Sequence, residues 1–234
     1  MKTVKICGID PSTKACGKCI MEVDPGTFDV ISVKLYAYHP TKIRSYVDDR
    51  LRIDCVGSKY EKMSIPERQM IAYKIMDIDM EDVKFVAFEG YAYSKAKGGG
   101  GSNSRGMVQL AEFIGTMKYR FFKQGKGLLI YPPTTIKKFA TSDGTADKLK
   151  MQFQFKNDHP DHYHEYLDKI TDWENPCSDI VDAYWICEAL RVHMKYDVFG
   201  SEALTPVELF GVQSHTAASS PLCETPILIM PNLT

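Results

Sequence analysis

The sequence predicts a mixed α/β fold in which one sheet carries helices on both faces. Three strand-length apolar segments come first, at 3–10, about 17–23 and 29–38, separated only by turn segments such as "PSTKA". This pattern is typical of an antiparallel meander. Two more such segments, 83–91 and 127–133, alternate with helical segments, which favours parallel strands added to the meander. We therefore expect a mixed five-stranded sheet.

Apolar spacing and capping residues predict the helices. Segment 64–80 begins with Ser64, an N-cap residue type, and carries isoleucines at helical spacing. Segment 107–124 is also predicted to be helical. Residues 135–155 are expected to form two helices separated by a Ser-Asp-Gly turn. A long helix is predicted over 178–197.

The chain is expected to form one folded domain followed by a tail. Residues 39–63 are polar and predicted to be irregular, and four consecutive glycines at 98–101 predict a mobile loop. Residues 201–234 contain four prolines and little periodicity. We therefore expect a domain over 1–198 and an extended tail or arm over 199–234.

Composition indicates a soluble globular protein. Of its 234 residues, 44% are hydrophobic and 25% charged, and no stretch approaches the roughly 20 apolar residues that span a membrane. The N-terminal residues enter a strand directly, so we expect no secretory signal. Seven scattered cysteines predict reduced thiols, and Cys16 and Cys19 would face opposite sides of a strand, so no zinc site is expected. These features predict a cytoplasmic protein, in a bacterial cytosol or a phage-infected cell.

Charge is unevenly distributed along the chain. Net charge is only −1, but residues 94–156 hold twelve Lys or Arg and three acidic residues, or +9 against −10 elsewhere. Such segregation can produce one positive face suited to a phosphate backbone, although solvated helix faces are an equally good explanation of this feature alone.

Four carboxylates occur where the predicted fold would bring them together. Asp10 ends the first strand and Glu89 the fourth, and they converge if these strands are parallel neighbours. Asp179 and Asp182 lie three residues apart, on one face of the last helix. Because four anions repel one another, a divalent cation is the natural partner. Oxygen ligands favour Mg²⁺, with Mn²⁺ expected to substitute, and two ions about 4 Å apart can clamp a phosphodiester.

Four motifs resemble, in order, those of the RuvC Holliday-junction resolvases of the ribonuclease-H-like superfamily. They are "GIDPSTKACG", "VAFEGYAY", "TIKKFATSDGTADKLKM" and "DIVDA". Ser12 and Asp143 stand where that family usually has glycine. The resemblance covers about residues 4–192, and it implies an RNase H-like fold with the strand composition predicted above.

The resemblance also implies roles for individual residues. The metal-binding and catalytic carboxylates would be Asp10, Glu89, Asp179 and Asp182. Lys148 matches the family's lysine near the scissile phosphate, where a cation stabilises developing charge. A DNA-binding surface would include Lys137, Lys138, Tyr91, Tyr93, Lys95, Lys97 and Arg105. The family's stacking aromatic corresponds to Ala92, so either flanking tyrosine could take that role.

The expected function is Mg²⁺-dependent nicking of four-way DNA junctions by metal-activated water. Symmetric nicking requires a two-fold dimer, and the resemblance implies that segment 107–124 contributes to it. One alternative is a general branched-DNA or flap endonuclease of the same fold, as in some viral relatives. A phage origin would suit the divergent tail. A different class, the actin-like or sugar-kinase ATP-binding domains, shares the Gly-Ile-Asp turn.

Overall fold

The structure is a computed structural model and describes residues 3–12, 15–40, 44–57, 59–90, 103–170 and 176–199. The predicted tail and the glycine loop lie outside these residues, so the predictions about them are not tested.

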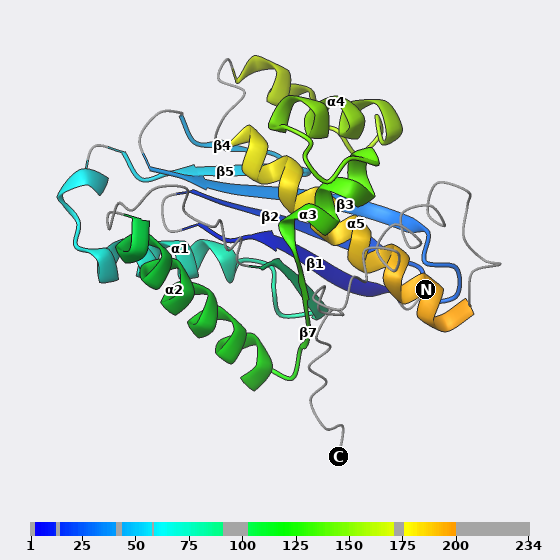
Figure 1. Cartoon of the computed structure of the whole chain (residues 1–234), viewed down its shortest axis with the longest axis horizontal. Helices are drawn as coiled ribbons and strands as arrows, with labels where there is room; N and C mark the ends of the chain where they lie inside the picture. Colours follow the sequence, from blue (N-terminus) through cyan, green and yellow to red (C-terminus); the bar gives the residue numbers. More distant parts are fainter. Residues whose placement is uncertain are drawn as a thin grey trace.

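A seven-stranded mixed sheet with the order β4-β5-β3-β2-β1-β6-β7 forms the centre of the molecule (Figure 1). Its strands are β1 (Val4–Asp10), β2 (Cys16–Val23), β3 (Val30–His39), β4 (Tyr46–Val47), β5 (Leu51–Cys55), β6 (Val83–Glu89) and β7 (Gly127–Tyr131). Strands β1, β2 and β3 form the predicted antiparallel meander. Strand β6 lies parallel to β1, and β7 lies parallel to β6. The predicted fold class is confirmed, with two strands more than expected.

The two additional strands correct the prediction that 39–63 is irregular. Strand β5 pairs in parallel with β3 and buries Leu51 and Ile53. A residue distant in the sequence fixes the turn before β5, because Nε2 of the buried His164 lies 2.7 Å from Asp48 Oδ2. In the sequence, apolar residues alternate with charged ones along β5, and the charged residues made the segment appear polar and irregular. The contact between Asp48 and His164 that fixes the turn could not be predicted from the local sequence.

The helices form one layer on each face of the sheet (Figure 1). Helices α1 (Ile65–Met76) and α2 (Asn103–Lys123) cover one face, and α3 (Pro133–Thr141), α4 (Lys148–Asp158) and α5 (Cys177–Phe199) cover the other. Two short 3₁₀ turns, Tyr60–Lys62 and Glu165–Lys169, complete the set. The predicted helices are confirmed with small shifts at their ends. No helix in the described ranges is long and apolar enough to cross a membrane.

The cysteines of the described residues are all free thiols, in agreement with the predicted reduced state. Cys16 packs in the core under α1, whereas Cys19 packs in the core under α5. The two thiols therefore point to opposite faces of β2, as predicted.

A buried lysine fixes the end of α1. Lys18 is fully buried on β2, and its ammonium lies 4.1 Å from the ring centroid of Tyr36. Its Nζ donates to carbonyl oxygens at 3.4, 3.2 and 2.6 Å, namely those of Ile75, Met76 and Ile78. These carbonyls lie at the C-terminus of α1, where they lack intrahelical partners and favour a cation. Lys18 thereby sets where α1 stops and the turn to β6 begins.

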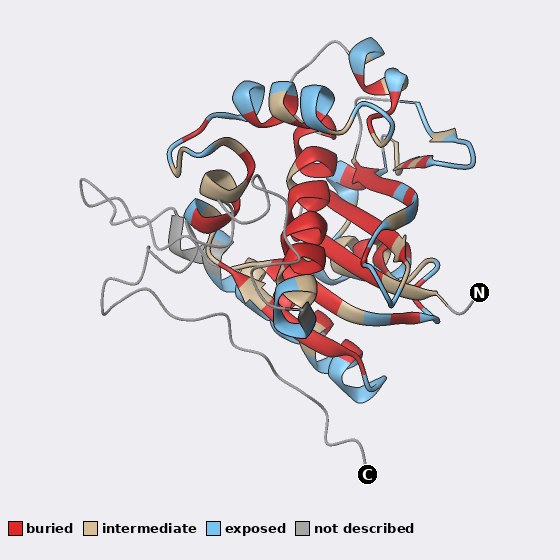
Figure 2. Cartoon of the chain, turned by 90° about the vertical axis from the view of Figure 1, so that its right-hand side faces the viewer, coloured by how far each residue is buried: buried red, intermediate tan, exposed pale blue. Residues whose placement is uncertain are grey.

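Helix α5 lies directly on the sheet because two strand positions have no side chain. A methyl group at Gly8 of β1 would overlap the backbone of Ala183 and Cys187. One at Gly17 of β2 would overlap the carbonyl of Asp179. Glycine within a strand often marks such a close backbone approach. Figure 2 shows α5 as a largely buried helix crossing the sheet.

The substitution Gly17→Ala should therefore displace the first turn of α5. We expect a loss of about 3 kcal/mol in the free energy of unfolding, at the upper end of overpacking costs, because the conflict is with backbone. Urea denaturation would measure it. The control is Gly106→Ala on α2, where an added methyl group meets no atom within 4 Å. That change should stabilise the protein by about 0.5–1 kcal/mol. Equal stability of Gly17→Ala and wild type would contradict the close approach.

Candidate active site

The two strand-end carboxylates lie side by side. Strand β1 pairs in parallel with β6, and Ile9 is opposite Phe88 in the register. The next residue on each strand is Asp10 and Glu89, so both acids lie at the same edge of the sheet. A side-chain hydrogen bond links the carboxyl groups of Asp10 and Glu89. The predicted convergence of these two residues is confirmed.

The first turn of α5 adds the other two carboxylates. The carbonyl of Pro176 accepts from the amide of Ile180 at 3.1 Å, so the helix begins one residue earlier than predicted. Asp179 and Asp182 extend from this turn. The glycine contacts under α5 hold the turn against the strand ends, and the charges of both aspartates act on Asp10. All four predicted carboxylates therefore belong to one site.

Burial dominates the electrostatics of this site. It raises the pKa of Glu89 to about 7, of Asp179 to about 8 and of Asp182 to about 6. Burial and then the charges of the other three acids raise the pKa of Asp10 well above its usual value. Asp179 is buried, whereas the other three keep part of their surface open to solvent. The site is therefore a cluster of acids that holds protons near neutral pH but remains accessible.

Two predicted lysines accompany the cluster. The charge of Lys148 lowers the pKa values of Asp179, Asp182 and Glu89, in opposition to burial. Lys148 is the first residue of α4, whose start is fixed by the Asp147 side chain accepting from the Lys150 amide at 2.8 Å. Its Nζ donates to the Ser178 hydroxyl at 3.0 Å.

Lys137 of α3 also belongs to the site. Its charge lowers the pKa values of Glu89 and Asp182. Lys138, the next residue, is not among the charges that act on the four carboxylates. Arg105 lies in the first turns of α2, and the structure gives no position for its side chain. Four predicted DNA contacts lie outside the described residues: Tyr91, Tyr93, Lys95 and Lys97.

The donor set fits a hard divalent cation. All four candidate ligands are carboxylates, and the buried Oδ2 of Asp179 has no hydrogen-bond partner among the described residues. Such an atom is costly unless an ion or a donor compensates it. Within the same residues, no three His, Cys, Asp or Glu side chains are already arranged around one point as metal ligands. Binding an ion would therefore require loss of the shared protons and rotation of side chains toward a common centre.

Sequence reasoning missed two contributors to the site. Ser178 lies in the first turn of α5, and its hydroxyl accepts from Lys148. Ser12 stabilises the turn after Asp10, since its amide donates to Cys16 Sγ at 3.3 Å and its carbonyl accepts from that thiol at 2.7 Å. The Ser12 hydroxyl, which a glycine would lack, accepts from the Ala15 amide at 3.4 Å. No sequence signal identified the partner of either residue.

Removing one carboxylate should stabilise the metal-free protein. Because the folded pKa of Asp182 is raised above its unfolded value, the folded state binds more protons in this range, and its stability falls as pH rises from about 4 through 6. Asp182→Asn lacks this penalty and should exceed wild type by about 1–2 kcal/mol at pH 8 in EDTA, with little difference near pH 4.

Thermal unfolding across this pH range would measure the effect. Glu61→Gln, on the exposed first 3₁₀ turn, is the control and should follow wild type. A destabilised Asp182→Asn protein at pH 8 would contradict the electrostatic description of the cluster.

Comparisons with known proteins agree with the motifs. No family model matches the sequence. A crossover junction endodeoxyribonuclease RuvC from Helicobacter pylori strain Shi470 is 22% identical over 154 residues, which cover 65% of this chain and 80% of the relative. RuvC proteins from Sulfurovum sp. and Campylobacter concisus are each 23% identical over 154 residues and 65% of this chain, covering 79% and 80% of the relatives.

Two solved structures are also similar. Thermus thermophilus RuvC in complex with a Holliday junction substrate gives a TM-score of 0.49 at 14% identity, covering 84% of this chain and 97% of that one. The yeast mitochondrial Holliday junction resolvase Ydc2 gives 0.48 at 12% identity, covering 86% and 83%. The sequence relatives confirm the resemblance to the RuvC crossover junction endonucleases that the four motifs of this chain indicate.

Proposed function

We propose that the protein is a metal-dependent endonuclease that resolves four-way DNA junctions by symmetric nicking. The observation that carries this proposal is the meeting of four carboxylates from β1, β6 and α5 with Lys148 held beside them. The similarity to RuvC proteins supports junction DNA as the substrate. We propose Mg²⁺ as the ion, with Mn²⁺ able to replace it, because the candidate ligands are all oxygen atoms.

Each group of side chains has a distinct task in this reaction. Asp10, Glu89, Asp179 and Asp182 would hold the metal, which when bound supplies an activated water and charge compensation at the scissile phosphate. Lys148 and Lys137 supply positive charge beside the carboxylates, so they can contact phosphate oxygens and stabilise charge that develops during cleavage. Ser178 keeps Lys148 pointed into the site.

The other hypotheses explain this geometry less completely. A flap or branched-DNA endonuclease would use the same chemistry and differs only in its substrate. An actin-like or sugar-kinase ATP-binding domain would use the turn after β1 for phosphate but gives no role to Asp179 and Asp182. Those two carboxylates lie with Asp10 in one cluster, which favours a nuclease.

A labelled synthetic four-way junction tests the activity directly. With Mg²⁺ we expect paired nicks at symmetric positions, absent in EDTA, and a rate at least roughly 100-fold lower in Asp182→Asn because a metal ligand is lost. Glu61→Gln should cut like wild type. Cutting of flaps without symmetry would favour the alternative substrate, and intact junction binding without any cleavage would refute the assigned chemistry.

Symmetric nicking needs two sites, and α2 offers a surface for pairing. Its buried face packs Phe113, Met117 and Phe121 under the sheet. On the opposite face, Val108, Tyr119 and Phe122 are 58, 66 and 41% exposed and recur at helical spacing. Exposed apolar side chains that no described part of the chain covers are suited to contact with a second copy of the chain. We therefore propose that α2 forms a two-fold interface.

Placing a charge in this stripe should separate the dimer. Tyr119→Glu combined with Phe122→Glu should raise the dimer dissociation constant at least tenfold, since each buried carboxylate lacks a partner. Analytical ultracentrifugation would measure it. Phe153→Glu on α4 is the matched control, because Phe153 is also 65% exposed but lies on another helix. A dimer that the α2 changes leave intact would place the interface elsewhere.

A further inference from the structure

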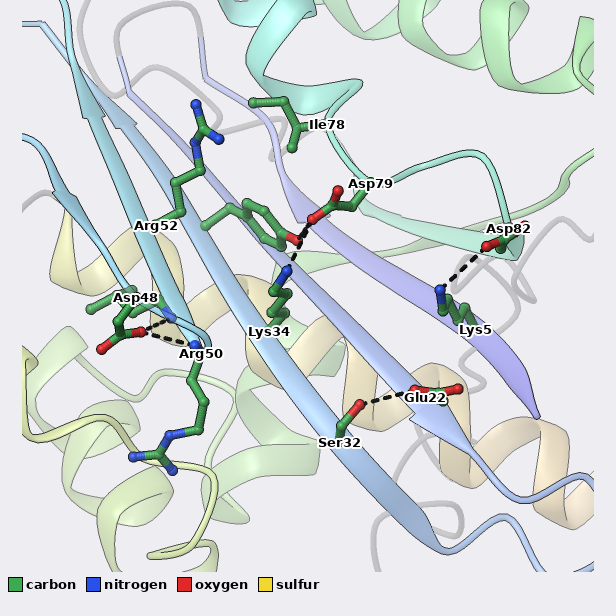
Figure 3. Close-up of polar contacts among 12 residues, drawn as sticks. Lys5, Glu22, Ser32, Lys34, Asp48, Arg50, Arg52, Ile78, Asp79 and Asp82 are labelled. Atoms are coloured by element: carbon green, nitrogen blue, oxygen red, sulfur yellow. Dashed lines mark hydrogen bonds and ion pairs between the residues drawn. The ribbon is translucent and has the colours of Figure 1, made fainter. Parts of the chain in front are cut away.

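Half of one sheet face is left uncovered by α1 and α2. Helix α1 ends at Met76, so it covers the end of β1 near Asp10 but not the opposite end. Figure 3 shows Lys5, Glu22, Ser32 and Lys34 standing on this open part of β1, β2 and β3. These side chains form the floor of a groove of about 1110 Å³.

The groove has an acidic wall and an acidic rim. The turn from α1 to β6 provides Asp77, Asp79, Glu81 and Asp82 on one side. Asp49 and Asp161 lie on the other side (the turn before β5 and the segment after α4), and Glu22 is on the floor. Against these seven carboxylates the lining contains three basic residues, Lys5, Lys34 and Arg50. The lining is therefore strongly negative.

The acidic wall is held in a fixed position. Besides Lys18, the buried Lys126 donates to the carbonyls of Met80 and Val83 at 2.5 and 2.9 Å. The Tyr36 hydroxyl donates to Asp79 Oδ2 at 2.5 Å. Two buried ammonium groups thus anchor the backbone of this turn from beneath, while its carboxylates face the groove. A preformed wall spares a ligand the cost of ordering it.

The carboxylates are only partly neutralised within the chain. Lys5–Asp82 and Lys34–Asp79 are partly exposed ion pairs of 3.3 Å, and Asp77 pairs with Arg120 of α2. Exposed pairs of this kind contribute little to stability. An incoming cation can therefore exchange with them at little cost. Among the described residues no ion pair involves Asp49, Glu81 or Asp161, which lie on both sides of the groove.

The groove lies away from the candidate active site. Lys5 and Asp10 are at opposite ends of β1, about 17 Å apart along the strand at roughly 3.3 Å per residue. The negative lining would repel DNA and attract cationic groups. Pockets for single small molecules enclose roughly 300–1,000 Å³, and this groove is larger and has the partly buried Ile78 in its lining.

We infer that this groove binds a lysine- or arginine-bearing segment of a partner protein while DNA occupies the active site. Carboxylates on the wall and the rim would each meet a cationic side chain, and apolar lining residues such as Ile78 would contact the alkyl stems. This inference goes beyond the nuclease proposal and does not depend on it.

A binding titration tests it. The probe is a short fluorescent peptide in which arginine alternates with valine, mixed with the full chain and Mg²⁺, and anisotropy reports binding. Glu81→Lys and Asp49→Lys should each weaken binding by about fivefold, since an attraction of the order of 1 kcal/mol is replaced by repulsion. Glu61→Lys makes the same charge change outside the groove and should have no such effect.

Each remaining outcome has one meaning. Equal weakening by Glu61→Lys would show non-specific attraction and overturn the inference, as would displacement of the peptide by equimolar spermidine, which would indicate a polyamine site. Absence of binding would also overturn it. Asp182→Asn should leave peptide affinity unchanged, and Glu81→Lys should leave junction cleavage unchanged. A failed nuclease proposal would therefore be distinguishable from a failed groove proposal.

Discussion

The close contact between α5 and two glycines of the sheet determines where the helix lies and where its acidic residues are placed. Gly8 and Gly17 let the helix backbone lie against β1 and β2, where any side chain would force it away. That approach sets the height of Asp179 and Asp182 above the sheet edge, where Asp10 and Glu89 end their strands. It also seals the core under α5, which is among the most completely buried parts of the chain (Figure 2). Both the packing of the core and the position of the four acids thus depend on the absence of a side chain at Gly8 and Gly17.

The carboxylate cluster works against folding stability. The fold holds four acids with raised pKa values together, and among the described residues Lys148 and Lys137 oppose their repulsion. Groups whose environment disfavours their charged form are typical of functional sites. The arrangement is best explained by a cation that compensates it, because nothing in the folding of the sheet requires these residues to be acidic.

Buried lysines have a different role in this protein. Lys18 and Lys126 lie under the turn from α1 to β6. Their ammonium groups donate hydrogen bonds to main-chain carbonyls there rather than to carboxylates. They place an acidic wall on the face of the sheet that α1 leaves open, at the far end of β1 from the carboxylate cluster. Opposite ends of one strand thus carry surfaces for opposite ligands: one suited to a phosphate backbone through a cation, and one suited to cationic side chains directly.

The sequence alone was enough to predict the meander, the parallel strands and the helices, because apolar periodicity and turn residues are local properties. It also determined the four acids, since strand ends and the first turn of a helix can be located along the chain. Tertiary packing accounts for the extension of the sheet by β4 and β5, because Asp48 contacts His164, over a hundred residues away. It also decided that Ser178 holds Lys148 and that Gly17 lies under Asp179. These contacts join residues far apart in sequence, so their partners are chosen by packing, which no local pattern records.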